Sequence, residues 1–179
     1  MRLFFAIALP EGIKSKLGGK LAELRESGID ASFVKNGQLH ITLLFLGEKS
    51  GYEKDGIVQN CSKIVFPKFG ISVRSAGFFP NENNIRVFWA GAETERGELG
   101  QLHSVVAKAC GMKPENNFTG HITLARVKSK RNIGELIKRK AEMQNEVFEE
   151  FTADNFVLMK SDPSPQGAKY SVVKEFKLK

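Results

Sequence analysis

Cysteine and histidine are scarce in this chain of 179 residues, which contains two cysteines and three histidines. Neither Cys61 nor Cys110 has a second cysteine at Cys-x-x-Cys spacing or a nearby histidine, so the sequence lacks the pattern of a zinc site. Each cysteine falls on the apolar side of a helical pattern, which predicts a core thiol. A chain of this size does not depend on disulfides, and we therefore expect a cytoplasmic protein without a metal or a cofactor.

Long apolar runs are also absent, because no stretch approaches the roughly 18 residues that a membrane helix requires. We therefore expect no insertion into a membrane. The apolar segment Leu3–Leu9 is short, ends at Pro10 and leads into an amphipathic pattern. These features predict a buried strand at the start of the chain and not a signal peptide.

Acidic residues are outnumbered, 20 against 27 basic residues, which gives a net charge of +7 and a pI near 9.4. This balance favours an anionic partner such as nucleic acid. Basic residues cluster in Lys128–Arg131 and in Lys138–Lys140, although such a run on a helix is also typical of a solvated face. The length and the hydrophobic content of 41% predict a single domain over residues 1–179, which we expect to be a monomer.

The tetrapeptide His-Ile-Thr-Leu occurs twice, at His40–Leu43 and at His121–Leu124. Successive side chains of a strand point to opposite faces, so each copy presents an imidazole and a hydroxyl on one face and two apolar side chains on the other. A short recurrence arises by chance, but chance does not explain a rare titratable residue in mid-strand at matching places. Two such strands would supply two histidines, able to divide acid and base roles near neutral pH, with two hydroxyl donors beside them. A phosphate ester fits such a site.

The spacing of apolar residues predicts strands that alternate with helices in two similar halves. In the first half we expect strands at Leu3–Leu9, Leu39–Leu46 and Gly70–Phe79, and helices at about Glu11–Ser27 and Glu53–Val65. A hairpin turn at Pro80–Asn83 leads into the second half. There we expect strands at Ile85–Ala90 and His121–Val127, helices at about Glu95–Cys110 and Ile133–Met143, and two closing strands, Val147–Lys160 and Ala168–Leu178, joined by a turn at Asp162–Gly167.

The two halves predict an α+β fold with two lobes. The spacing from Leu3 to His40 is close to that from Val87 to His121, as expected for related halves. We therefore expect two mainly antiparallel sheets with flanking helices, related by a pseudo-twofold axis, with the histidine strands on either side of a cleft.

These motifs resemble the signature of the two-histidine (2H) phosphoesterase superfamily. The resemblance extends to the RNA 2′,3′-cyclic phosphodiesterase branch, also called the 2′-5′ RNA ligase family. It is carried by the two histidine segments, Leu39–Glu48 and His121–Arg126, by Arg86–Gly91, and by a closing segment from Gly167 to Tyr170. Such a resemblance implies a two-lobed fold, no metal, and hydrolysis of a 2′,3′-cyclic phosphate at an RNA end, tRNA fragments included, to a 2′-phosphomonoester. Some members also join RNA ends in the reverse reaction.

The same resemblance implies that His40 and His121 are the catalytic pair and that Thr42 and Thr123 hold phosphate oxygens. It also implies a phosphate contact for Arg126, yet strict alternation places Arg126 on the face opposite His121. The strand must therefore bulge or end near Ala125, or the long side chain must reach around; otherwise Arg126 is structural.

The two identical motifs do not themselves divide the acid and base roles. If Arg126 lies near His121, its positive charge disfavours protonation of that imidazole. This predicts His121 as the general base toward water and His40 as the general acid toward the ribose 3′-oxygen, as the resemblance also implies.

Two rival functions are open at this point. A metal-dependent phosphoesterase would need more ligands, since two histidines fall short of the three usual at a catalytic zinc. A module that binds RNA ends or nucleotides without turnover would keep the same cleft. Other residues are less informative: we expect His103 to have a surface or interhelical role, and Phe33, Trp89 and Phe118 are candidates for base stacking in a chain whose 14 phenylalanines must mostly form the core.

Overall fold

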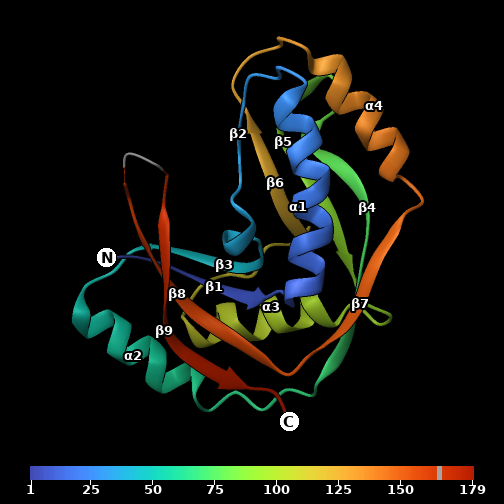
Figure 1. Ribbon diagram of the computed structural model, residues 1–179. Coiled ribbons are helices and arrows are strands. Elements are labelled where there is room, and N and C mark those ends of the chain that lie inside the picture. Colours follow the sequence, from blue (N-terminus) through green and yellow to red (C-terminus); the bar gives the residue numbers. More distant parts are fainter. Residues whose placement is uncertain (165–166) are drawn as a thin grey trace.

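The structure, a computed structural model, describes residues 1–164 and 167–179 (Figure 1). These residues form four α-helices and one short 3-10 helix: α1 (Glu11–Glu26), η1 (Asn36–Gln38), α2 (Gly51–Cys61), α3 (Glu98–Ala109) and α4 (Ile133–Met143). They also form nine strands: β1 (Arg2–Ala8), β2 (Ala31–Phe33), β3 (His40–Glu48), β4 (Phe69–Asn81), β5 (Asn84–Glu93), β6 (His121–Val127), β7 (Val147–Ala153), β8 (Asn155–Asp162) and β9 (Lys169–Lys177). The α+β class is confirmed. The turn expected at Asp162–Gly167 lies partly outside the described residues.

All the described strands belong to one antiparallel sheet with the order β7-β4-β5-β6-β3-β1-β8-β9, and β2 pairs with β6. The sequence predicted two sheets, but the strands form two halves of a single sheet, because β3 pairs with β6 and joins them. That junction has a single pair in register, Ile41 with Ile122. Each half therefore contributes one histidine strand to the junction. The relation of the halves by a pseudo-twofold axis stays a prediction.

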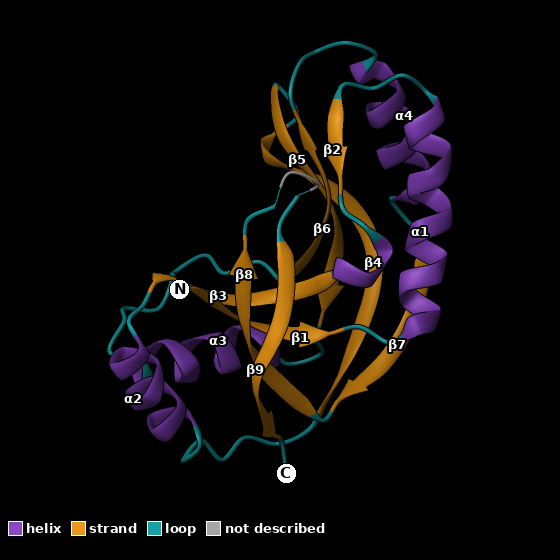
Figure 2. Cartoon of the chain, turned by 60° about the vertical axis from the view of Figure 1, so that its left-hand side comes forward, coloured by secondary structure: helices purple, strands orange, loops and turns teal. Residues whose placement is uncertain are grey.

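The helices cover the sheet from two sides. In Figures 1 and 2, α1 and α4 lie together along the half that holds β4, β5 and β6, whereas α2 and α3 lie near β3 and β1. One large hydrophobic core runs through both halves and includes fully buried side chains from each, such as Leu17, Phe88 and Leu136. Burial of this apolar surface is the main force that holds the arrangement together.

The single strand expected at Val147–Lys160 is wrong, because the chain divides there into β7 and β8 at Asp154. Strand β7 pairs with β4, and β8 pairs with β1 on the opposite half of the sheet. No glycine or proline marks the division, and the local signal is the polar pair Asp154-Asn155, residue types that often bound strands. The chain crosses there from one half of the sheet to the other.

Local chemistry also sets the helix ends. Helix α2 begins earlier than expected because Ser50 and Glu53 form a reciprocal capping box, and it ends at Cys61. Helix α3 begins at Glu98 because Gly97, with φ of +72°, interrupts the expected helix before that point.

The two cysteines are free, and they lie closer together than their separation in sequence suggests. The Sγ atoms of Cys61 and Cys110 are 3.8 Å apart where α2 packs against α3. Cys61 is buried and Cys110 is half-buried. None of the helices formed by residues 1–164 and 167–179 is long and apolar enough to cross a membrane.

Candidate active site

The two histidine motifs are neighbours in the sheet because β3 and β6 pair at Ile41 and Ile122. Both isoleucines are fully buried, whereas the flanking histidines and threonines are half-buried. In an antiparallel pair the neighbours of opposed residues also face one another, and alternation turns them to the other side of the sheet. The pairing therefore places His40 beside Thr123 and Thr42 beside His121 on one face.

A β-bulge in β6 brings Arg126 to the same face. Thr123 pairs with Trp89 of β5, but Ala125 pairs with Phe88, so one extra residue lies between them on β6. As a result Arg126 pairs with Val87, which is two positions from Trp89 and therefore on its face. The sequence left open a bulge, a strand end near Ala125 or a long reach of the side chain as ways to bring Arg126 to the histidine face, and the bulge is confirmed.

Strand β3 contains the same irregularity at the corresponding place. Thr42 pairs with Ala6, whereas Leu44 pairs with Phe5, and Phe45 then pairs with Phe4. Phe45 is thereby turned to the histidine face, where 63% of its side chain is exposed. The position that holds a cation in one motif thus holds an aromatic ring in the other.

The imidazoles are oriented alike by main-chain carbonyls. Nδ1 of His40 donates to the carbonyl oxygen of Gln38 at 2.7 Å, and Nδ1 of His121 donates to that of Thr119 at 2.8 Å. Because a carbonyl oxygen only accepts, each Nδ1 carries a hydrogen, and Nε2 is the atom that gains and loses a proton. Nε2 of His40 lies 3.1 Å from the hydroxyl oxygen of Thr42.

Both histidines titrate below the usual range of an imidazole. Burial lowers the pKa of His40 most, its bond to Gln38 opposes this, and the charges of His121 and Arg126 lower it further. Burial also lowers the pKa of His121 most; its bond to Thr119 opposes this, and the charge of Arg126 adds to the lowering. Arg126 therefore acts on both imidazoles, so its charge does not distinguish an acid from a base.

Aromatic rings flank the two histidines on opposite sides. The rings of Phe4 and Tyr170 lie 5.1 Å and 5.3 Å from the His40 ring, and Tyr170 meets it edge-on. On the other side, the ring of Phe79 lies 4.9 Å from that of His121 and 5.1 Å from that of Trp89. Each imidazole is thus held in a partly desolvated setting.

A cavity of about 470 Å³ opens beside His40. Its walls include the apolar side chains of Val157 and Met159 together with Tyr170, and its rim includes Lys14 and Lys169. An apolar floor with a few polar groups at the edge is typical of a small-molecule site. The cavity is large enough for a nucleoside.

The structure brings all five residues expected from the sequence, His40, Thr42, His121, Thr123 and Arg126, to one face of the sheet. Sequence reasoning missed the carbonyls of Gln38 and Thr119 and the rings of Phe4, Phe79 and Tyr170. The two carbonyls could have been found, because each belongs to the residue two positions before a histidine. The rings could not, because they come from distant strands. In the part of the chain that the structure describes, no three His, Cys, Asp or Glu side chains form a group able to hold a metal ion.

Other candidates have structural roles. The surface or interhelical role expected of His103 is wrong: the side chain is buried, and its Nδ1 binds the carbonyl of Leu43 in strand β3. Phe118 stacks on His103, with ring centroids 4.5 Å apart, and Phe33 lies under the guanidinium of Arg25. Neither ring is placed against the catalytic candidates.

Two His-x-Thr motifs on one face of a sheet, on adjacent strands, define the class of two-histidine phosphoesterases. The chain belongs to the 2′-5′ RNA ligase superfamily, whose model matches residues 13–165. It is similar to an RNA 2′,3′-cyclic phosphodiesterase of Archaeoglobus fulgidus, with 35% identity over 98% of this chain and 99% of the relative. An enzyme of the same name from Methanocaldococcus jannaschii is also 35% identical, over 98% of this chain and all of the relative.

Solved structures of similar proteins share the fold. The structure of TT0787 of Thermus thermophilus has a TM-score of 0.81 and 30% identity, and the match covers 99% of this chain and 98% of that one. Escherichia coli LigT complexed with ATP has a TM-score of 0.75 and 26% identity, over 99% of this chain and 97% of that one. The likeness therefore extends over nearly the whole chain.

Proposed function

We propose that this protein hydrolyses the 2′,3′-cyclic phosphate at an RNA end to a 2′-phosphomonoester. The observation that carries the proposal is the junction of β3 and β6, which sets two imidazoles and two hydroxyls on one face. Relatives that are 35% identical over nearly their whole length are named RNA 2′,3′-cyclic phosphodiesterases. The net charge of +7 suits an RNA substrate.

Each of the two histidines carries out one proton transfer. Nε2 of His121 takes a proton from water while the water oxygen attacks phosphorus. The bond between phosphorus and the ribose 3′-oxygen breaks, and Nε2 of His40 gives its proton to that oxygen. Phosphorus keeps its bond to the 2′-oxygen, so the product is a 2′-phosphate. Each proton transfer contributes about 10²–10⁴-fold to the rate.

The position of the cavity beside His40 supports this division of roles. The cavity of about 470 Å³ lies beside His40, with the ring of Tyr170 at its wall. A nucleoside in this cavity holds its ribose oxygens next to Nε2 of His40, while the opposite side of the phosphate faces His121. The leaving oxygen and the attacking water then lie in line, each next to one imidazole.

Three further side chains stabilise charge on the phosphate. Thr42 and Thr123 donate hydrogen bonds to the non-bridging oxygens, and the Arg126 guanidinium pairs with the same group. Donors aimed at developing charge contribute about 10²–10³-fold each. Arg126 forms no ion pair within residues 1–164 and 167–179, so its charge is available to a phosphate.

The same ring opening gives 2′-5′ ligation when the 5′-hydroxyl of a second RNA end, in place of water, loses its proton to His121 and attacks phosphorus. The bond to the 3′-oxygen breaks as before, and the 2′-oxygen and the new 5′-oxygen remain on phosphorus. The superfamily description favours this second activity.

We also propose that the protein acts as a cytoplasmic monomer and that tRNA fragments are among its substrates. The free thiols of Cys61 and Cys110 fit a reducing compartment.

A panel of 2′,3′-cyclic phosphate ends tests the proposal. The panel presents the same terminal nucleoside on a mononucleotide, an oligonucleotide and a tRNA fragment, and each product is identified as a 2′- or a 3′-phosphate. We expect 2′-phosphates from all three substrates. Tight binding of these ends without conversion would instead support a binding module, and release of 3′-phosphates would contradict the assigned leaving oxygen.

A further inference from the structure

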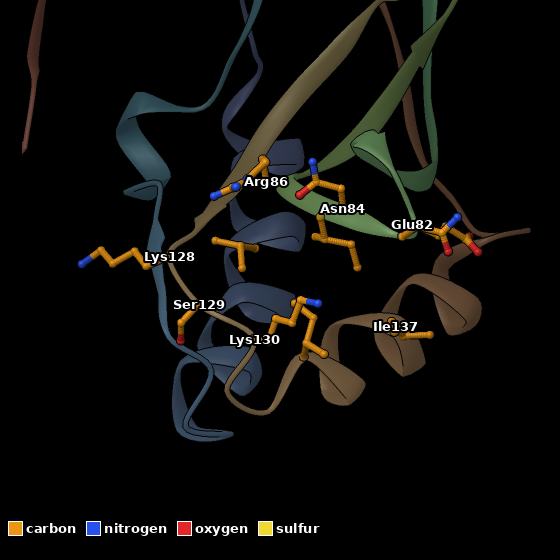
Figure 3. Close-up of a pocket in the computed structure, with 11 residues that line it drawn as sticks. Glu82, Asn84, Arg86, Lys128, Ser129, Lys130 and Ile137 are labelled. Atoms are coloured by element: carbon orange, nitrogen blue, oxygen red, sulfur yellow. The ribbon is translucent and has the colours of Figure 1, made fainter.

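A second cavity lies at the end of β6, after the strand has passed Arg126. It measures about 370 Å³ and is formed by the tip of the β4–β5 hairpin, the loop after β6 and the first two turns of α4 (Figure 3). We call it the hairpin pocket. Its lining includes three cations, Arg86, Lys128 and Lys130, and one acidic residue, Glu82.

The positive charge of the hairpin pocket is not compensated. Glu82 is paired with Lys140 at 2.9 Å, and none of the three cations forms an ion pair in the part of the chain that the structure describes. The neighbouring basic run differs, because Arg139 pairs with Glu23 and Glu142. Two of the three cations at Lys138–Lys140 are therefore neutralised within the protein, whereas the cluster at Lys128–Lys130 is left to an external anion.

The floor of the hairpin pocket is apolar. It is formed by Ile85, Val127, Ile133 and Ile137, and Ile137 is 46% exposed. Asn81 accepts hydrogen bonds from the backbone of two residues at the hairpin tip, which fixes the edge of the pocket. An apolar floor bordered by cations suits a nucleotide, whose base needs an apolar contact and whose phosphate needs a positive charge.

The hairpin pocket lies just past the end of β6, and its floor is on the other side of the sheet from the histidines. Arg126 lies on the histidine face, and Lys128 follows it by two residues, or about 7 Å at the rise of a strand, whereas Val127 between them turns toward the core and α4. In Figure 3 the side chains of Arg86 and Lys128 extend in the same direction, away from Ile137. Unpaired cations thus lead from the histidines to the end of the sheet, which an RNA strand must cross to reach the floor.

We propose that the hairpin pocket binds the RNA nucleotides immediately 5′ to the reacting end. This inference rests on the proposed function, because it assigns the path of the same substrate. The terminal nucleoside occupies the cavity beside His40, Arg126 holds the cyclic phosphate, and the preceding phosphates contact Arg86, Lys128 and Lys130. One upstream base lies on the isoleucine floor.

The test compares kcat/KM for cyclic phosphate substrates of increasing length, from the mononucleotide to an octamer, at several salt concentrations. The pocket variant carries Arg86→Gln, Lys128→Gln and Lys130→Gln. The control variant carries Lys63→Gln, Lys68→Gln and Lys108→Gln, three cations outside every ion pair and cavity described, so that both variants lose the same charge.

We expect the wild type and the control variant to prefer the octamer over the mononucleotide by tenfold or more at low salt. The pocket variant loses most of this preference but hydrolyses the mononucleotide within twofold of the wild-type rate. For the octamer, the slope of log kcat/KM against log salt concentration is less steep in the pocket variant than in the wild type by about 2. This difference is expected for three lost phosphate contacts to a single strand. An equal length preference in the two variants would overturn the proposal.

A substitution without charge tests the floor separately. Ile137→Asn is expected to lower the octamer preference at least threefold, whereas Val105→Asn, at a position on α3 that is 36% exposed and outside the pocket, leaves it unchanged. An unchanged preference in Ile137→Asn would overturn the placement of a base on this floor. Failure of the proposed function is distinguishable, because the wild type would then leave the mononucleotide intact at every salt concentration.

Discussion

The imidazole of His103 donates a hydrogen bond of 2.7 Å to the carbonyl oxygen of Leu43, at the point where β3 bulges. The bulge takes one residue of β3 out of the ladder with β1, and His103 supplies a partner for its carbonyl. The second ring nitrogen of His103 accepts a bond of 2.9 Å from the backbone N–H of Glu115. This buried residue therefore anchors the histidine strand β3 to α3.

The first prediction concerns stability. Replacing His103 by leucine leaves the carbonyl of buried Leu43 and the N–H of exposed Glu115 without their partner, and a buried, unsatisfied group costs about 1–3 kcal/mol. We expect His103→Leu to lower the free energy of unfolding by about 1–3 kcal/mol, measured by chemical denaturation. Ser104→Ala, at the position next to His103 on α3, is the control and is expected to change the free energy of unfolding by less than about 0.5 kcal/mol. A loss in His103→Leu as small as in the control would refute the anchoring role.

The second prediction concerns pH. The base must be neutral and the acid protonated, so the acidic limb of kcat/KM follows the pKa of the base and the alkaline limb that of the acid. Burial and Arg126 lower the pKa of both His40 and His121, so the profile is expected to centre below the ordinary imidazole pKa of about 6.5. Loss of the Arg126 charge raises both pKa values.

Arg126→Gln is therefore expected to move both limbs to higher pH and to lower kcat/KM by about 10²–10³-fold, since a charged donor to the phosphate is lost. Arg126→Lys keeps the charge and is expected to keep the position of both limbs. Titration of the histidine ring protons by NMR checks the same shifts without turnover. Limbs that stay in place in Arg126→Gln would show that the guanidinium does not act on the imidazoles.

The third prediction separates the roles of the two histidines. In a cyclic substrate with sulfur in place of the 3′-bridging oxygen, the leaving thiolate needs no general acid. His40→Ala is expected to recover most of its activity on this substrate, whereas His121→Ala stays inactive because water still needs a base. Recovery in His121→Ala alone would reverse the assignment.

Much of the site could be predicted from the sequence because alternation in a strand is a local rule. It places His40 with Thr42 and His121 with Thr123 without knowledge of the fold. The face of Arg126 could not be derived in this way, because it depends on a bulge. A signal was present, since both motifs continue with two successive apolar residues, Leu43-Leu44 and Leu124-Ala125, all of which are buried.

Features that depend on packing between distant segments were out of reach. The ring of Tyr170 reaches His40 only because β9 and β8 complete the half of the sheet that begins with β1. The contact between Cys61 and Cys110 depends on how α2 meets α3, although each cysteine was correctly predicted to face the core side of its helix. The polar pair Asp154-Asn155 marks the division between β7 and β8, but the pairing of these strands with β4 and β1 depends on the whole sheet and not on a local pattern.

The central claim is that His40 and His121 together carry out the hydrolysis without a metal. The most direct measurement compares the wild type with His40→Ala and His121→Ala on a 2′,3′-cyclic phosphate RNA in excess chelator, and measures binding of the 2′-phosphate product in parallel. We predict full wild-type turnover in chelator, a loss of about 10²–10⁴-fold in each variant, and product affinity within a few-fold of wild type. Loss of wild-type activity on chelation with recovery on adding a divalent metal, or turnover near the wild-type rate in either variant, would contradict the account.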